Sequence, residues 1–200
     1  MQNTLMTILR DKNTDIALFR KTTEKITHLL AQEAIKIVKE KDIVVVTPLE
    51  KTQGGKMDQA VVLIPILRSG SAFLPIFMYY FENAPIGFIG LKRDEKTAVA
   101  EHYYSNLPKI KTADLVIILD PMIATGGSAI YALKMLKKQK VNEKNILFIS
   151  LIAAPEGLSA IKKEFPNVRI ITHKIDKGLN KNKYILPGLG DFGDRYFGTI

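Results

Sequence analysis

The sequence contains no cysteine, and only 3 of its 200 residues are histidines. Without cysteine the chain can form no disulfide and can offer no thiolate ligand to a metal. The histidines, His28, His102 and His173, do not follow a metal-binding spacing. No nucleophile with an accompanying general base is apparent either. The composition therefore favours neither a metal centre built from side chains nor covalent catalysis.

Long hydrophobic runs are also missing. The stretch Met1–Arg10 has no apolar core of the length that a signal peptide requires. The most apolar stretch, Val61–Phe81, is interrupted by Pro65, Arg68 and Pro75, which argues against a membrane span. We therefore expect a soluble protein of the cytoplasm that does not associate with membranes.

Acidic side chains are fewer than basic ones, because 20 Asp and Glu stand against 29 Lys and Arg and leave a net charge of +9. The lysines are dispersed without interleaved aromatic residues, which is typical of solvated helix faces and loop tips. We therefore expect no nucleic-acid partner. A basic surface also attracts polyphosphorylated substrates, so charge alone does not separate these functions.

Apolar runs alternate with segments of helical periodicity through most of the chain. This alternation predicts an α/β protein with a parallel central sheet flanked by helices. The polar stretch Thr47–Asp58 predicts a hairpin or arm. Strands are expected at Ile43–Val46, Val61–Ile66, Ile86–Leu91, Leu115–Leu119, Ile146–Ile152 and Val168–Thr172, and helices within Thr14–Lys39, Ser71–Phe81, Ala129–Lys140 and from Gly157 to Phe165.

One of these strands leads into a stretch suited to phosphate binding. Leu115–Leu119 is followed by Asp120 and then by the small, hydroxyl-bearing run Ala124–Ser128. Backbone N–H groups of a glycine-rich loop and a helix N-terminus can hold a phosphate, and a carboxylate can accept hydrogen bonds from ribose hydroxyls. A plain strand-to-helix turn with Ser128 as the helix N-cap is the alternative. The acid at the strand end favours a site for a ribose 5-phosphate.

Two arginines also follow strands. Arg68 comes after the strand that begins at Val61, and Arg93 ends the strand that begins at Ile86. Ligands of parallel sheets bind beyond the carboxyl ends of the strands, where two guanidinium groups could hold a diphosphate. The long polar stretch Asp94–Lys111 predicts a lid. Within it, Tyr103 and Tyr104 either seal the site or pack as ordinary loop aromatics.

The C-terminal run Tyr184–Arg195 is rich in glycine and lacks an apolar period. Backbone groups fixed in such a run can read the edge of a flat heterocycle. A tail that packs across the domain is the alternative.

The two runs Asp120–Ser128 and Tyr184–Arg195, in this order and about sixty residues apart, resemble the pair of signatures of the uracil phosphoribosyltransferases. The resemblance implies a type I phosphoribosyltransferase fold in a single domain, 1–200, with a core at about 58–172 and a β-arm used in dimer contacts. It also implies a small hood and base-binding segment from 1–45 and 173–200. The implied reaction converts uracil and 5-phospho-α-D-ribose 1-diphosphate (PRPP) to UMP and diphosphate in pyrimidine salvage.

The resemblance also implies roles for individual residues. Asp120, Arg93 and Asp191 carry catalysis, with Asp120 on the ribose hydroxyls and Asp191 aligning the two substrates. The implied PRPP contacts are Arg68, Arg93, Asp120, Pro121, Met122, Ile123, Ala124, Thr125, Gly126, Gly127, Ser128 and Asp191. The implied uracil contacts are Tyr184, Ile185, Gly190, Asp191 and Phe192. Mg²⁺ is the implied cofactor, held mainly through the diphosphate of the substrate rather than by protein ligands. GTP is a possible effector, and a homodimer or a higher homo-oligomer is expected.

Some residues depart from the family pattern. Phe192 stands where the family usually has a small residue, so its ring could narrow the base pocket. Ser69 and Ser71 replace apolar neighbours of Arg68, Pro121 replaces a second acid of other type I enzymes, and Lys183 replaces a glycine. Two other functions stay open: an RNA-binding regulator that keeps the fold, and a weak or retargeted paralogue.

Overall fold

The structure, a computed structural model, describes residues 2–93 and 100–199. Seven strands within these residues form one sheet in the order β5-β4-β3-β6-β8-β9, and the short β7 pairs with the end of β8. Its strands are β3 (Val61–Leu67), β4 (Phe88–Arg93), β5 (Ala100–Asn106), β6 (Leu115–Leu119), β7 (Met122–Ile123), β8 (Ile146–Ala153) and β9 (Arg169–Ile175). All neighbours are parallel except β4 and β5. The expectation of a mostly parallel α/β sheet is confirmed.

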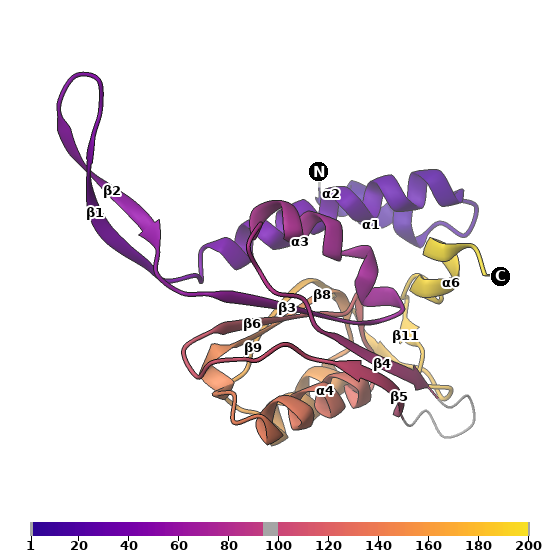
Figure 1. Ribbon diagram of the computed structural model, residues 1–200. Coiled ribbons are helices and arrows are strands. Elements are labelled where there is room, and N and C mark those ends of the chain that lie inside the picture. Colours follow the sequence, from indigo (N-terminus) through magenta and orange to yellow (C-terminus); the bar gives the residue numbers. More distant parts are fainter. Residues whose placement is uncertain (1, 94–99, 200) are drawn as a thin grey trace.

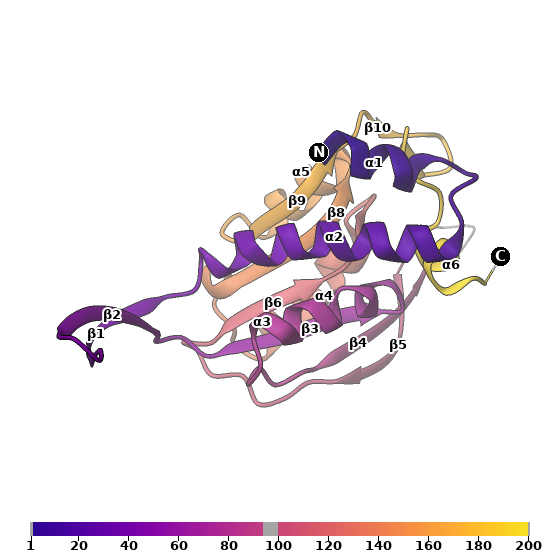
Figure 2. The same cartoon turned by 90° about the horizontal axis from the view of Figure 1, so that it is seen from above.

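Helices cover both faces of this sheet (Figure 1). One face carries α1 (Gln2–Arg10), α2 (Ile16–Ile35), α3 (Leu74–Tyr80) and, at its end, α6 (Phe192–Phe197), and the other face carries α4 (Gly127–Lys138) and α5 (Pro155–Glu164). Seen from above, α2 runs along the whole sheet (Figure 2). In the part of the chain that the structure describes, no helix combines the length and apolarity that crossing a bilayer requires.

The central strand β3 shows why its sequence has no polar alternation. Val61 and Leu63 pack in the cluster beneath α2 and α3, whereas Val62 and Ile64 pack in the cluster above α4 and α5. All four side chains are at most 5% exposed. A strand that is buried on both faces needs apolar residues at every position, which is the pattern typical of parallel sheets.

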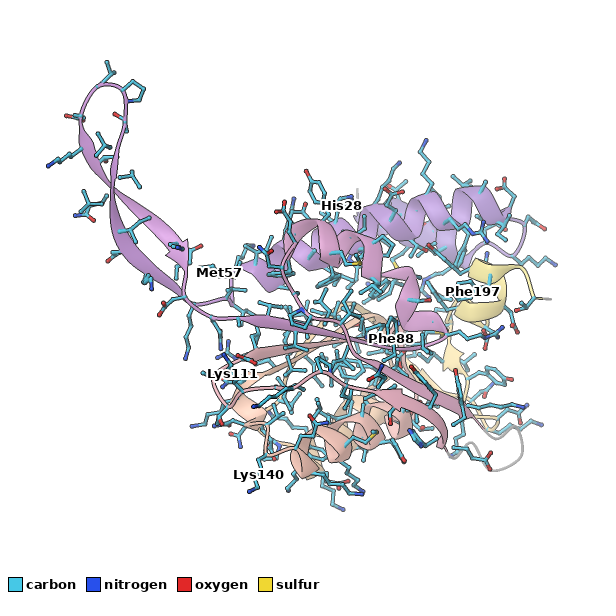
Figure 3. All side chains as sticks on the ribbon, in the orientation of Figure 1. His28, Met57, Phe88, Lys111, Lys140 and Phe197 are labelled. Carbon is cyan, nitrogen blue, oxygen red and sulfur yellow. The ribbon has the colours of Figure 1, made fainter. Side chains whose placement is uncertain are left out.

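A two-stranded hairpin projects away from this body (Figure 1). It consists of β1 (Glu40–Val46) and β2 (Lys51–Met57), paired antiparallel, as the sequence predicted for an arm. Its side chains point outward along its length (Figure 3). Val44, Val46 and Leu49 are 62%, 74% and 95% exposed, so the arm presents apolar side chains that nothing in the chain covers.

The predicted lid is partly wrong. Residues 100–106, in the middle of the predicted lid, form β5, which pairs antiparallel with β4 at the edge of the sheet. Residues 94–99 of the predicted lid lie outside the described residues. The polar residues of β5 suit an edge strand because one of its faces stays in water.

The sequence analysis also missed structure at both ends of the chain. It assigned no element to the residues that form α1, and it expected irregular chain where β11 (Ile185–Leu186) and α6 form. β11 pairs with β10 (Gly178–Leu179) in a small second sheet. The remaining predicted helices and strands are present, with ends that differ by one to a few residues.

Candidate active site

The chain stays hydrogen-bonded to β8 after β6 ends. These bonds position the run Asp120–Ser128. The N–H of Asp120 donates to the carbonyl of Ile149 (3.1 Å), and the carbonyl of Pro121 accepts from the N–H groups of Leu151 (2.9 Å) and Ile152 (3.0 Å). The buried hydroxyl of Ser150 also donates to the carbonyl of Pro121 (3.0 Å). Met122 and Ile123 then pair with β8 again as β7. The motif therefore begins at the carboxyl edge of the sheet.

The glycine-rich run forms the beginning of α4. Gly126 is the N-cap, with a left-handed φ of 83°, and no side chain caps the helix. Ser128 lies inside the first turn, so the alternative in which Ser128 is the N-cap is wrong. The first N–H groups of a helix lack intrahelical acceptors and suit an anion. A cavity of about 170 Å³ lies against this turn and is lined by every residue from Met122 to Ala129.

Asp120 lies half-buried beside this cavity, which it lines. Burial raises the pKa of its carboxyl from the ordinary value of 3.8 to about 7, and a hydrogen bond from the backbone N–H of Met122 opposes the shift. Desolvation disfavours the charged carboxylate, whereas a donor stabilises it. A carboxyl that lines a hollow and whose pKa is shifted toward 7 is typical of functional sites.

Arg68 follows the neighbouring strand β3. Its side chain is 59% exposed, and its Nη2 lies 3.4 Å from Oδ1 of Asp194. Arg93 is the last residue of β4, beside β3, so its backbone lies at the same edge of the sheet. The side chain of Arg93 lies outside the described residues, and the predicted contact with a diphosphate stays a prediction for it.

The C-terminal segment approaches the same edge from the hood side. Ile185 is buried in β11, Tyr184 is 54% exposed, and Gly190 has a φ of 81°. Asp191 caps α6, with its Oδ1 accepting from the N–H of Asp194 (2.9 Å). Tyr184, Ile185, Gly190 and Asp191 all line the cavity beside α4.

The structure settles where the ring of Phe192 lies. Phe192 is 1% exposed. Its ring packs against Phe19 and Phe73 of the core, with centroids 5.5 and 6.4 Å away, and is stacked on Tyr196. The ring therefore anchors α6 to α2. Phe192 also lines the cavity beside α4, and its effect on the base pocket stays a prediction.

A second, wider hollow of about 1040 Å³ adjoins the cavity. Both are lined by Ser69, Asp120, Ser128, Lys183, Tyr184 and Asp191. The wider one is also lined by Arg68 and Tyr103, so the structure brings the predicted phosphate, diphosphate and base residues to one continuous hollow. Pro121 is buried and holds the loop through its carbonyl instead of lining the hollow.

Sequence reasoning missed several cations around this hollow. Lys92, Lys181 and Lys183 line it. Lys183 has a φ of 64°, a left-handed conformation that favours glycine. The replacement of a glycine of the family pattern by Lys183 was the available signal.

Comparison with known proteins identifies the family. A model of the family described as uracil phosphoribosyltransferase matches residues 1–199. The chain belongs to the uracil phosphoribosyltransferase family. A uracil phosphoribosyltransferase of Campylobacter fetus subsp. fetus is 46% identical over 195 residues, which cover 98% of this chain and 92% of that relative. A uracil phosphoribosyltransferase of Limosilactobacillus fermentum is 44% identical over 195 residues, which cover 97% of this chain and 92% of that relative.

Solved structures show the fold. The AQ2163 protein from Aquifex aeolicus matches with a TM-score of 0.89 and 36% identity, over 98% of this chain and 93% of that chain. A hypoxanthine-guanine phosphoribosyltransferase from Bacillus anthracis matches with a TM-score of 0.51 and 14% identity, over 80% of each chain. The chain therefore has the type I phosphoribosyltransferase fold that the resemblance implied.

The burial of Asp120 predicts a pH-dependent effect on stability. Between pH 4 and 7 the folded protein keeps a proton that the unfolded chain releases, so this group's contribution to the free energy of unfolding falls as the pH rises through that window. Asp120→Asn removes the titration. We expect its free energy of unfolding, relative to the unchanged protein, to increase from pH 5 to pH 8, as measured by urea denaturation. If the difference in free energy of unfolding between the two proteins did not vary with pH, the pKa of Asp120 would be the same in the folded and the unfolded chain, which would contradict the prediction.

Substitutions of two neighbouring glycines are expected to differ in their effect on stability. A Cβ at Gly126 would lie 2.9 Å from the carbonyl oxygen of Gly157, and its φ is left-handed. We expect Gly126→Ala to reduce the free energy of unfolding by about 1–3 kcal/mol. Gly127→Ala is the matched control, because its nearest atom would be the Thr125 hydroxyl at 3.5 Å. Equal losses in urea denaturation for the two variants would contradict this account of the loop.

Proposed function

We propose that the protein transfers the 5-phosphoribosyl group of PRPP to uracil and releases UMP and diphosphate. In this reaction the bond between C1 of the ribose and the diphosphate breaks, a bond from C1 to N1 of uracil forms, and the N1 proton leaves. The observation that carries the proposal is the continuous hollow lined by both motifs. Membership of the uracil phosphoribosyltransferase family supports the choice of base.

The 5-phosphate would lie against the first turn of α4. Residues Thr125–Ser128 line the cavity there, and they offer backbone N–H groups and two hydroxyls. The helix dipole adds partial positive charge at the same point. The site can therefore hold a dianion without a dedicated lysine, which agrees with the absence of a P-loop lysine after Gly127.

Asp120 would accept hydrogen bonds from the ribose hydroxyls. With a pKa of about 7, its carboxyl takes up or gives up a proton at little free-energy cost near neutral pH. In this arrangement the carboxylate would also lie close to C1, where positive charge develops as diphosphate leaves, and would stabilise that charge. Positioning and charge stabilisation then supply the catalysis without a nucleophile.

Arg68 and Arg93 would neutralise the diphosphate at the ends of β3 and β4. Among residues 2–93 and 100–199, no cluster of three or more metal-binding side chains occurs. The carboxylates on the hollow, Asp120, Asp191 and Asp194, fit a Mg²⁺ ion that takes most of its oxygen ligands from the substrate. When bound with PRPP, the ion would offset charge on the diphosphate.

The base would lie against the backbone of Ile185 and of Gly190–Phe192. Uracil presents two carbonyl acceptors and an N–H donor, which backbone groups can match without side-chain chemistry. Asp191 stands between the two halves of the hollow and would align the substrates. The inward ring of Phe192 would leave this recognition intact, and thus disfavours a paralogue retargeted through that residue.

We also propose that the protein works in the cytoplasm as a homodimer or a larger homo-oligomer. The exposed Val44, Val46 and Leu49 of the hairpin support an intersubunit role, because a second copy would remove these side chains from water. Control by GTP stays a prediction from the family resemblance. An RNA-binding role receives little support from the dispersed lysines.

The reaction can be tested by incubating the purified protein with PRPP, Mg²⁺ and uracil and following UMP by chromatography. Cytosine, hypoxanthine and orotate serve as parallel substrates. We expect UMP from uracil and no corresponding nucleotide from the other bases. Cytosine and hypoxanthine lack the acceptor, donor and acceptor edge that the backbone groups match, and orotate carries an additional carboxylate beside N1. Product from another base in place of uracil would contradict the proposed specificity, and the lack of any product would contradict the proposed reaction.

The role of Asp120 predicts a large effect of Asp120→Asn on turnover. The amide has the same shape but loses the charge that accepts from two hydroxyls and faces C1, so we expect kcat to fall by about a hundredfold or more. Steady-state kinetics at pH 8 measure this. Asp58→Asn is the control, because Asp58 is exposed at the opposite end of β3. Near-normal turnover of Asp120→Asn would remove Asp120 from the mechanism.

A further inference from the structure

The end of α1 is tied to the end of β9 by an ion pair outside the proposed site. Nη2 of Arg10 lies 2.5 Å from Oδ1 of Asp176. The side chain of Asp176 is only 2% exposed, and that of Arg10 is 22% exposed. The N–H of Asp176 donates to the carbonyl of Ala153 at the end of β8 (2.9 Å), so its position is set by the sheet. The pair thus joins the C-terminal end of α1 to the central sheet.

The second oxygen of Asp176 reaches the base-binding segment. Its Oδ2 accepts a hydrogen bond from the N–H of Gly188 (2.9 Å). Gly188 has a φ of 65°, and a Cβ there would lie 2.2 Å from the carbonyl oxygen of Ile185. The turn between Ile185 and Gly190, both of which line the cavity, is therefore tight and is held by one carboxylate.

A second arginine binds the same segment to α1. Nη1 of Arg195 donates to the carbonyl of Leu189 (2.7 Å) and to that of Leu9, and Nη2 donates to the carbonyl of Asp11 (2.6 Å). The guanidinium also lies 4.4 Å from the centroid of the Phe19 ring. Arg195 therefore holds the carbonyl of Leu189, and Asp176 holds the N–H of the preceding residue, Gly188.

We propose that Arg10 and Asp176 are positioning residues for the base: the chain from the Arg10 guanidinium through the Asp176 carboxylate to the Gly188 N–H sets the backbone that reads uracil. This rests on the proposed function, in which the base lies against Ile185 and Gly190. Neither residue lines either cavity of the site; both line a separate hollow of about 380 Å³ between α1 and β9. Their effect on the base is therefore indirect and passes through Gly188.

This arrangement predicts a selective effect on one substrate. Asp176→Asn keeps the size of the side chain but leaves one acceptor oxygen for two donors, so either Arg10 or Gly188 loses its partner. Arg10→Met leaves the bond to Gly188 in place but removes the ion pair. We expect each variant to raise KM for uracil about tenfold, the effect of one lost hydrogen bond, and to change KM for PRPP less than about twofold. Arg10→Lys should recover most of the loss.

The test measures both KM values by UMP formation and the dissociation constant of uracil by calorimetry in the presence of diphosphate. Lys134→Met is the control, since it breaks an ion pair with Glu164 on α4 and α5. The double variant of Arg10 and Asp176 should lose no more than Asp176→Asn alone, because both act through one chain. If Asp176→Asn does not fold, Arg10→Met and Arg10→Lys still give the comparison.

The outcomes separate two failures. No UMP from the unchanged protein would contradict the proposed function and this inference with it. Normal UMP formation, with variants that melt at lower temperature but keep the KM for uracil, would show a purely structural ion pair and overturn the inference alone. A parallel rise in both KM values would also overturn it, because the effect would not be confined to the base.

Discussion

The carbonyl oxygen of Pro121 is the point on which the geometry of the site depends. It accepts from two N–H groups of β8 and from the Ser150 hydroxyl, which holds the chain against the sheet after β6 has ended. Asp120 on one side and the loop to Gly126 on the other take their positions from this attachment. A side-chain acid at residue 121 would not change these main-chain bonds, but proline has no N–H that needs an acceptor there.

The same attachment explains why Asp120 is desolvated. A residue that follows a fully buried strand and whose N–H bonds to β8 cannot move its carboxyl far into water. The raised pKa of Asp120 is a consequence of this burial, and the hydrogen bond from the backbone N–H of Met122 opposes it. Local destabilisation of this kind is expected at functional sites, where the surrounding structure maintains a group in a state that it would not adopt by itself.

The sequence predicted the local structure around the proposed phosphate site, strand, loop and helix, because that stretch is continuous in the chain. The strand ending at Leu119, the acid at Asp120 and the loop through Ser128 are successive residues, so local pattern and spacing were sufficient. Three features were not predictable in this way. β5 reads as a polar loop because it is an edge strand, α1 is short, and the inward direction of Phe192 depends on Phe19 and Phe73, which are far away in the sequence.

The proposed base half shows the physical reason for this difference. Its backbone is held by Asp176 from the end of β9, which is itself paired with Arg10 of α1, and by Arg195 from α6, so three distant segments must fold before it has a shape. Arg10 and Asp176 present no local pattern, and each looks like an ordinary surface charge in the sequence. A phosphate can be bound by one turn of a helix, whereas the edge of a flat base requires several backbone groups at fixed positions. Recognition of the base is therefore the part of the site that depends most on the complete fold.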